Sequence, residues 1–378
     1  MGANETGGEP LASQLDLSSA YSFRDSSSLR FTHENKYSQN RYSRDSSIAA
    51  QSLERELSSH HSGFKALAFR SGMAAIETLM SWAWLKFDNF YVQSEIYRKS
   101  EAVIANLSNL SNRSVTLLER DSSNFTHSHN PNSFFFFELP SNPHLRISSL
   151  WREISTQPVR PFLFVDATLS GLGNLNQDLE KAVDVLCYSL TKYIGGHNDL
   201  IGGVLYVRPE VYEEIWEARS RMGNIIGPVE AQLCRRSLQT FSIRFQKQCE
   251  NALIVLEGLL KFRELGLLED IFYPGSASNG SELAIAEKTI DLFGAVISFV
   301  VPGDRNALAE KFEGFKCVKI APSFGSTDSL IEICSLMSRP TASSEELAMS
   351  GLEPNLVRLS VGLEDPNLVL MDIRKLLG

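Results

Sequence analysis

Short apolar runs without a polar face are the feature of this sequence that most constrains its fold. They are NFYVQ from Asn89, SFFFFEL from Ser133, FLFVDA from Phe162, AVDVLCYSL from Ala182 and GGVLYV from Gly202. A strand that is apolar on both faces belongs inside a sheet that is covered on both sides, as parallel sheets are. Stretches with helical periodicity alternate with several of these runs. The pattern therefore predicts an α/β fold built on a buried parallel sheet.

The character of the chain changes twice along its length, which predicts three regions. Residues 1–62 are polar and rich in serine, so we interpret them as an arm that cannot form a core of its own. Residues 63–235 contain the apolar runs and form the predicted large α/β domain. Residues 236–378 begin in a long helical stretch and continue with AVISFV, NLVRLSV and DPNLVLMDIRKLL. We expect them to form a bridging helix and a smaller α+β domain.

Composition and charge exclude several classes of function. The 378 residues include 36 Lys and Arg and 45 Asp and Glu, a formal net charge of −9. The chain therefore has no overall positive field for nucleic acid or anionic lipid. It contains no apolar run of membrane-spanning length, and its first residues lack the pattern of a signal peptide. We expect a cytoplasmic protein with no nucleic-acid partner and no membrane partner.

The cysteines and histidines do not show the spacing of a metal site. The five cysteines are far apart in the sequence and form no CxxC pair. The neighbouring pairs His60 and His61, and His127 and His129, have no carboxylate or cysteine at ligand spacing. We therefore expect no metal and interpret these histidines as surface residues. His197, in GGHND, is expected to have a structural hydrogen-bonding role.

Two charged residues that follow apolar runs define the candidate site. Asp166 ends the run FLFVD, and Lys192 follows the run that ends in Ser189. Because the carboxyl ends of parallel strands meet at one edge of a sheet, where ligands bind, Asp166 and Lys192 are expected to come together there. Taken alone, each has a simpler interpretation, since an Asp at a strand end is often a cap and a loop Lys is often solvated.

The combination fits the chemistry of pyridoxal 5'-phosphate. A lysine near apolar strand ends loses its proton readily and can attack the cofactor aldehyde as a free amine. A carboxylate that faces the pyridine nitrogen keeps that nitrogen protonated. For the phosphate, Ser71, Gly72 and Met73 offer backbone N–H groups at the start of a predicted helix, and Ser189 and Thr191 add hydroxyl donors.

The segment YSLTKYIGGHNDLIGG, which contains Lys192, is the most specific motif of the chain. Further motifs are YSR at 42–44, FRSGMAAI at 69–76, SEIYRKS at 94–100, ELPSNP at 138–143, PSFGSTDSLI at 322–331 and NLVRLSVGLEDP at 355–366. In this order they resemble motifs of the Cys/Met-metabolism family of pyridoxal-phosphate enzymes, the transsulfuration family. That family includes cystathionine γ-synthase, cystathionine lyases and methionine γ-lyase. The resemblance extends along nearly the whole chain.

The resemblance implies a fold and a set of site residues. The fold would be the fold-type I pyridoxal-phosphate transferase fold, with a mainly parallel seven-stranded sheet and a smaller α+β C-terminal domain. The catalytic residues would be Lys192, which carries the cofactor and moves protons, Asp166, which pairs with the ring nitrogen, and Tyr97, which stacks on the ring. Other cofactor contacts would come from Ser71, Gly72, Met73, Asn142, Ser189 and Thr191, with Tyr42 and Arg44 from a neighbouring subunit. Arg358, with Ser323 nearby, would bind the substrate α-carboxylate.

The same resemblance gives the N-terminal arm a purpose. A polar segment that cannot bury itself is useful if it completes the site of a partner, and the segment that matches the family here is Tyr42 to Arg44. We therefore expect an obligate homo-oligomer, a tetramer assembled as a dimer of dimers, in which the arm completes a neighbour's site.

Several positions near the expected substrate pocket depart from the family pattern. Tyr97 is followed by Arg98 and Lys99 where the family has two glycines, Ala167 stands in place of an asparagine, and Pro322 in place of the glutamate of γ-synthases. In one interpretation the two cations meet an anionic group of an unusual amino acid, and in the other they point into solvent. The cofactor residues are unchanged, so the departures favour an altered substrate.

The expected reaction is replacement or elimination of a γ substituent on an amino acid such as an O-acylhomoserine or cystathionine, as in a cystathionine γ-synthase. Two alternatives within the family remain open. One is a γ-substitution enzyme that makes a specialised non-proteinogenic amino acid, and the other is a β-lyase that cleaves a carbon–sulfur bond. A third hypothesis, a non-catalytic member retained for binding, is disfavoured by the intact Lys192 and Asp166.

Overall fold

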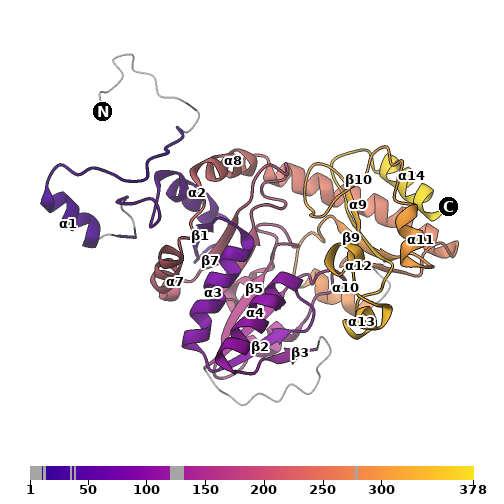
Figure 1. The fold of residues 1–378 in the computed structure, drawn as a ribbon, viewed down its shortest axis with the longest axis horizontal. Helices are drawn as coiled ribbons and strands as arrows, with labels where there is room; N and C mark the ends of the chain where they lie inside the picture. The colour runs from indigo at the N-terminus through magenta and orange to yellow at the C-terminus, as the bar shows by residue number, and fades with distance from the viewer. Residues whose placement is uncertain (1–10, 12–13, 35, 38–39, 120–131, 277–279) are drawn as a thin grey trace.

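The computed structural model of this chain contains two β-sheets that are connected by a long helix (Figure 1). It describes residues 11, 14–34, 36–37, 40–119, 132–276 and 280–378. The first sheet lies in the purple and pink part of Figure 1, and the second lies in the orange and yellow part with the C-terminus. Among the helices of the described residues, none is both long enough and apolar enough to cross a membrane.

The large sheet has seven strands in the order β1-β7-β6-β5-β4-β2-β3. The strands from β3 to β6 in this order run parallel, and β7 is antiparallel to both of its neighbours. The predicted mainly parallel seven-stranded sheet is therefore confirmed. The strands are β1 (Lys65–Phe69), β2 (Asn89–Gln93), β3 (Thr116–Leu118), β4 (Ser133–Glu138), β5 (Phe162–Asp166), β6 (Val185–Ser189) and β7 (Gly203–Val207).

The run of phenylalanines in β4 shows why this sheet is buried on both faces. Successive side chains of a strand point to opposite faces. Phe134 and Phe136 accordingly join one core, and Phe135 and Phe137 join the other, all almost fully buried. Helices α3 (Gly72–Lys86), α4 (Arg98–Ser111) and α7 (Pro209–Met222) contribute to the first core. Helices α2 (Ile48–Ser58), α5 (Leu150–Ser155), α6 (Gln177–Ala182) and α8 (Pro228–Leu238) contribute to the second.

The second sheet has five strands in the order β10-β11-β12-β9-β8. It is mixed, because β10 and β11 are parallel while the other pairs are antiparallel. Its strands are β8 (Asp270–Phe272), β9 (Val296–Val300), β10 (Lys319–Ile320), β11 (Leu330–Ile333) and β12 (Leu356–Ser360). The helices of this region are α10 (Gly280–Glu287), α11 (Arg305–Glu310), α12 (Cys334–Ser338), α13 (Ser344–Met349) and α14 (Pro366–Leu377).

Helix α9 (Phe241–Glu264) bridges the two sheets, in line with the long helical stretch of the sequence. Phe245 packs edge-on against Tyr193, which follows β6, with ring centroids 4.9 Å apart. Gln248 Nε2 donates a 2.6 Å hydrogen bond to the carbonyl of Ser326, and Asn251 Nδ2 donates one of 3.1 Å to Gly362. The helix therefore fixes loops of the small sheet against the large one. The domain limits at residues 62 and 235 remain predictions.

The N-terminal region differs in part from the predicted arm. Leu53 and Leu57 of α2 are fully buried, and Glu54 accepts a 2.9 Å hydrogen bond from Ala68 N and pairs with Arg219. Helix α2 is therefore ordered against the large sheet and joins its second core, although the predicted large domain begins only at residue 63. Helix α1 (Ser26–Glu34), in contrast, extends away from the body of the molecule (Figure 1).

Candidate active site

Three polar residues end neighbouring parallel strands of the large sheet. Glu138 of β4 pairs in register with Asp166 of β5, and Asp166 pairs with Cys187 of β6, two residues before Ser189. Lys192 follows in a tight turn, where its N–H donates a 3.3 Å hydrogen bond to the carbonyl of Ser189. The backbone thus brings Asp166 and Lys192 to the same edge of the sheet, as predicted from the order of the strands.

Asp166 is a buried carboxylate that a side chain close in sequence holds in place. Its Oδ1 accepts hydrogen bonds from Thr168 N (3.0 Å) and Thr168 Oγ1 (2.6 Å), and Thr168 Oγ1 accepts one from Ser189 N (2.9 Å). Burial raises the pKa of Asp166, and the hydrogen bonds from Thr168 oppose this shift. A buried carboxylate of this kind gains from a cationic partner, which a protonated pyridine nitrogen provides.

Lys192 has the environment of an amine that is kept partly uncharged. Its Nζ donates a 2.8 Å hydrogen bond to Ser323 Oγ and lies 4.9 Å from the centre of the Phe324 ring. Burial, followed by the positive charge of Arg358, lowers the pKa of Lys192 to about 8, although Glu332 acts in the opposite direction. Roughly a tenth of this amine is therefore the free base at pH 7, and this form can act as a nucleophile or a proton acceptor.

Ser323 occupies a backbone conformation that is unusual for its type. Its φ of 97° lies in the left-handed region, where residues other than glycine are uncommon. Such a conformation costs about 1–3 kcal/mol and is maintained where the surrounding structure requires it. Here it occurs at the residue whose hydroxyl meets Lys192, in the segment between β10 and β11. Ser323 therefore lies directly beside Lys192, and its role toward the substrate remains a prediction.

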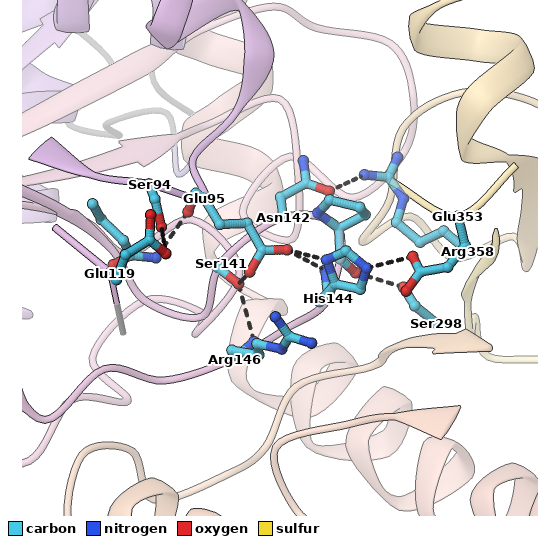
Figure 2. Close-up of polar contacts among 12 residues, drawn as sticks. Ser94, Glu95, Glu119, Ser141, Asn142, His144, Arg146, Ser298, Glu353 and Arg358 are labelled. Atoms are coloured by element: carbon cyan, nitrogen blue, oxygen red, sulfur yellow. Dashed lines mark hydrogen bonds and ion pairs between the residues drawn. The ribbon is translucent and has the colours of Figure 1, made fainter. Parts of the chain in front are cut away.

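Arg358 carries the positive charge of the site on the side of the small sheet. It faces Glu332 in register across β12 and β11, and its Nη2 lies 2.6 Å from Glu332 Oε1. Its Nη1 donates a 2.9 Å hydrogen bond to Asn142 Oδ1, from the loop after β4 (Figure 2). Arg358 is only 8 % exposed, so these contacts fix the plane of its guanidinium. A fixed guanidinium is well suited to binding a carboxylate with two hydrogen bonds.

The start of α3 forms the opposite end of the site. Ser71 caps the helix, with its Oγ accepting a 3.0 Å hydrogen bond from Ala74 N. Glycine is required where this turn meets β7, because a Cβ on Gly203 would lie 2.4 Å from Ser71 O. A Cβ on Gly72 would lie 3.2 Å from Ser189 Cβ, so Ser189 is directly beside the helix start. Backbone N–H groups at such a terminus favour a phosphate.

Thr191 and Tyr97 have different surroundings. The Thr191 hydroxyl accepts a 3.0 Å hydrogen bond from Gly202 N and donates one of 3.3 Å to Gly202 O, so its donor is already used within the turn. Tyr97 immediately precedes α4, and its N–H donates a 2.6 Å hydrogen bond to Glu138 Oε2. Its side chain is 42 % exposed, which leaves the ring accessible for stacking. The roles of both residues toward the cofactor remain predictions.

Tyr42 and Arg44 are exposed on the N-terminal region. The Arg44 guanidinium lies 5.4 Å from the centre of the Tyr42 ring, and Arg44 passes close to Gly223 at the end of α7. Their exposure leaves both side chains accessible to another subunit. Their contact with a neighbour's cofactor remains a prediction.

The histidines are distributed differently from the expectation. His61 is buried and contacts Glu180 through Nδ1 at 2.5 Å, so the interpretation of His61 as a surface residue is wrong. It lies beside the aromatic rings of Tyr188 and Tyr206, which the polar sequence around it did not indicate. His197 Nδ1 lies 2.6 Å from the carbonyl of Gly195, a structural contact. His127 and His129 lie outside the described residues.

The residues present fit pyridoxal phosphate. The site combines an amine of lowered pKa, a buried carboxylate that a cation would stabilise, and a helix start that approaches β7 too closely for any side chain. Together they match the aldehyde, the pyridine nitrogen and the phosphate of that cofactor. The fold and the site therefore define a pyridoxal-phosphate enzyme of fold-type I.

Comparison with known proteins gives the family. The family model described as "Cys/Met metabolism PLP-dependent enzyme" matches residues 3–377, and the chain belongs to that family. An L-methionine γ-lyase of Fusobacterium nucleatum is 30% identical over 334 residues, which are 85% of this chain and 82% of that protein. A cystathionine β-lyase of Lactococcus lactis is 28% identical over 353 residues, 89% of this chain and 88% of that protein.

Solved structures agree with this assignment. A cystathionine γ-synthase from Xanthomonas oryzae pv. oryzae, in complex with cystathionine, superposes with a TM-score of 0.85. The sequences are 26% identical, and the match covers 99% of this chain and 94% of that one. The expected family, fold class and cofactor are thus confirmed, and the chain is a pyridoxal-phosphate-dependent enzyme of Cys/Met metabolism.

Sequence reasoning missed three residues that shape the site. Thr168 holds Asp166, Glu138 holds the backbone of Tyr97, and Glu332 orients Arg358. Two of them carried a signal. Thr168 lies two positions after an Asp, a spacing at which side-chain to backbone hydrogen bonds are common. Glu332 interrupts the apolar run LIEI, where a buried charge requires a partner of opposite sign.

Proposed function

We propose that this enzyme replaces or eliminates a γ substituent on an amino acid such as an O-acylhomoserine or cystathionine, in the manner of a cystathionine γ-synthase. The observation that carries the proposal is the placement of the Lys192 amine beside Ser323, with the guanidinium of Arg358 fixed next to it. An amine that can move protons and a cation that can bind a carboxylate are the two protein groups that this chemistry needs at Cα.

Binding of the substrate would begin at Arg358. Its guanidinium would pair with the α-carboxylate, since Asn142 and Glu332 already fix its orientation. This contact would place Cα of the substrate near Lys192 Nζ. Pyridoxal phosphate, when bound, supplies a ring that accepts the electron pair left at Cα after proton loss. Asp166 would hold the proton on the ring nitrogen, because its negative charge favours the protonated form.

Lys192 would perform the proton transfers. Once its amine is free, Nζ would take the proton from Cα and pass it on, which makes the amine neutral again. It would then take a second proton from Cβ, which allows a leaving group at Cγ to depart. Its lowered pKa makes it a suitable base near neutral pH. Addition of a nucleophile at Cγ would complete a replacement. If no nucleophile adds at Cγ, hydrolysis of the carbon–nitrogen bond would release a 2-oxo acid and ammonia and complete an elimination.

The N-terminal region would complete the site in an oligomer. Tyr42 and Arg44 are exposed on the segment between α1 and α2, and α1 itself extends away from the body of its own chain (Figure 1). An arginine and a tyrosine hydroxyl could add phosphate contacts to a neighbouring subunit. We propose a tetramer assembled as a dimer of dimers.

A second candidate, a γ-substitution enzyme that makes a specialised amino acid, is favoured by the surroundings of Arg98. This residue lines a groove of about 950 Å³ between α4 and the α12–α13 segment, together with Arg339. Both arginines act on Glu101: burial raises the pKa of Glu101, while Arg339 and Arg98 lower it. Arg98, which follows Tyr97 in the sequence, and Arg339 from the small domain could together meet an anionic distal group of the substrate.

A panel of amino acids tests these candidates. The holoenzyme is incubated with O-succinylhomoserine, O-phosphohomoserine, cystathionine and methionine, each with and without cysteine, and ammonia, 2-oxo acid and new amino acids are measured. The proposal expects turnover of at least one γ-substituted amino acid. Exclusive cleavage at Cβ of cystathionine, which yields homocysteine and pyruvate, would instead establish the β-lyase alternative.

A further inference from the structure

His144 connects the two domains through two carboxylates (Figure 2). Its Nδ1 contacts Glu95 Oε1, and its Nε2 lies 2.7 Å from Glu353 Oε2. Glu95 lies between β2 and α4 of the large domain, whereas Glu353 lies between α13 and β12 of the small domain. The imidazole is 6% exposed. We call Glu95, His144 and Glu353 the clasp.

The clasp is supported on both sides. Glu95 also accepts hydrogen bonds from Ser141 Oγ (2.7 Å) and from the backbone N–H of His144 (3.2 Å). From the small domain, Ser298 Oγ of β9 donates a 2.7 Å hydrogen bond to the carbonyl of Pro143, and the Phe272 ring of β8 packs edge-on at 4.8 Å from the imidazole. The loop after β4 is therefore held by both domains at once.

The two carboxylates hold His144 in its doubly protonated form. Burial would lower the pKa of His144, but the hydrogen bonds and charges of Glu353 and Glu95 raise it to about 9. Burial would raise the pKa values of Glu95 and Glu353, but His144, and more weakly Arg146, bring both below the usual value. Glu101 and Glu138, two further carboxyl groups near Glu95, interact with it unfavourably.

Each member of the clasp lies close in sequence to a residue of the candidate site. Glu95 precedes Tyr97 by two positions, and His144 follows Asn142 by two. Glu353 lies three positions before the start of β12, the strand of Arg358, whose guanidinium donates to Asn142. A shift of the small domain at Glu353 would therefore move Arg358 relative to Asn142 and Tyr97.

We propose that His144 is a positioning residue, and that the clasp fixes the small domain so that Arg358 and Tyr97 are held in the geometry that binds the amino acid. The inference rests on the proposed function, in which Arg358 binds the α-carboxylate. The clasp determines the affinity of the enzyme for the amino acid, because binding of the α-carboxylate depends on the relative placement of groups from both domains. It contributes little to cofactor retention, since Lys192, Asp166 and the start of α3 all belong to the large domain.

The clasp also has a definite pH range. His144 has a raised pKa, so its contribution to stability is complete below the unfolded value of 6.5 and is lost as the pH rises through about 9. The lowered pKa values of Glu95 and Glu353 add stability above the model value of 4.5, which is lost as the pH falls below it. His144 is therefore mainly cationic near pH 7 and mainly neutral near pH 10, where the charge attraction within the clasp is lost.

Glu353→Gln is the variant that tests the clasp. The Glu353 side chain is 37% exposed, so the neutral amide that replaces it remains in contact with solvent. In this variant Glu95 still pairs with His144. The dissociation constant of the holoenzyme for L-norleucine, which has an α-carboxylate but no leaving group, is measured from the change in cofactor absorbance. We expect an increase of about tenfold near pH 7. Near pH 10, where His144 is neutral in both proteins, the ratio of variant to wild type should approach one.

Glu180→Gln is the matched control, because Glu180 pairs with the buried His61 and neither residue belongs to the small domain. It should leave norleucine affinity unchanged, and His144→Gln should reproduce the effect of Glu353→Gln without adding to it in the double variant. A ratio that stays constant from pH 7 to pH 10, or an equal effect of Glu180→Gln, would overturn the inference.

Failure of the proposed function is recognised separately. If the wild-type holoenzyme binds neither norleucine nor any amino acid of the panel, the proposed function is wrong. In that case thermal unfolding tests the clasp independently of amino-acid binding. The melting temperature of Glu353→Gln should lie below that of the wild type near pH 7 and equal it near pH 10, whereas a pH-independent difference, or none, would contradict a protonated His144 that links the domains.

Discussion

Lys192 Nζ donates a 2.8 Å hydrogen bond to Ser323 Oγ, and this contact joins the residue that follows β6 to the loop between β10 and β11. The amine of the large domain thus meets the small domain at the point where Arg358 also reaches the carbonyl of Ser323, at 3.5 Å. The reactive amine and the cation that would bind the substrate are therefore placed together by contacts between domains.

Arg358→Ala should weaken substrate binding more than cofactor binding. Removal of the guanidinium deletes a charge-assisted pair with the α-carboxylate, a loss of about 2–3 kcal/mol, or about a hundredfold in KM. It also leaves Glu332 buried without its cation, so some loss of stability is expected. Steady-state kinetics and the visible absorbance of the cofactor check this. Loss of the cofactor from a folded variant would show that Arg358 binds the cofactor and not the substrate carboxylate.

Asp166→Asn should retain the fold and lose activity. The amide can still accept the hydrogen bonds of Thr168, but it has no charge to hold the proton on the ring nitrogen. We expect kcat to fall about a hundredfold or more, while the cofactor remains bound. The measurement is turnover per bound cofactor. An activity close to that of the wild type would mean that Asp166 does not face the ring nitrogen.

The capture of the cofactor should depend on the protonation of Lys192. The pKa of its amine is lowered to about 8, so the protonated form dominates below that value and the free base above it. In apoprotein mixed with pyridoxal phosphate, the rate of the visible absorbance change should rise about tenfold per pH unit below pH 8 and then level off. A pH-independent rate between pH 6 and pH 9 would contradict this assignment.

An intersubunit arm predicts complementation between two inactive variants. Arg44→Ala removes the arm contact and Lys192→Ala removes the amine, so each homo-oligomer should have low activity. In a mixed oligomer, one site combines the intact arm of one chain with the intact Lys192 of another. Refolding the two together should therefore restore activity above that of either alone. No recovery, with mixed oligomers demonstrated by mass, would exclude a swapped arm.

The central sheet and the placement of Asp166 and Lys192 could be predicted, because the local sequence pattern determines both. Apolar runs require a buried parallel sheet, and its strand order brings Asp166 and Lys192 to one edge. Helix α2 was missed because packing against β1, rather than the local sequence, stabilises it. The clasp of His144 could not be predicted, because Glu353 lies 209 residues after His144 in the sequence and meets it only after both domains fold.

Reductive trapping tests the central claim most directly. The holoenzyme is treated with borohydride, which converts the covalent link between an amine and the cofactor aldehyde into a stable bond, and the protein is digested and analysed by mass spectrometry. The account predicts the cofactor mass on the peptide that contains Lys192 and on no other lysine. A modified peptide from elsewhere in the chain, or an unmodified Lys192 in cofactor-loaded protein, would contradict it.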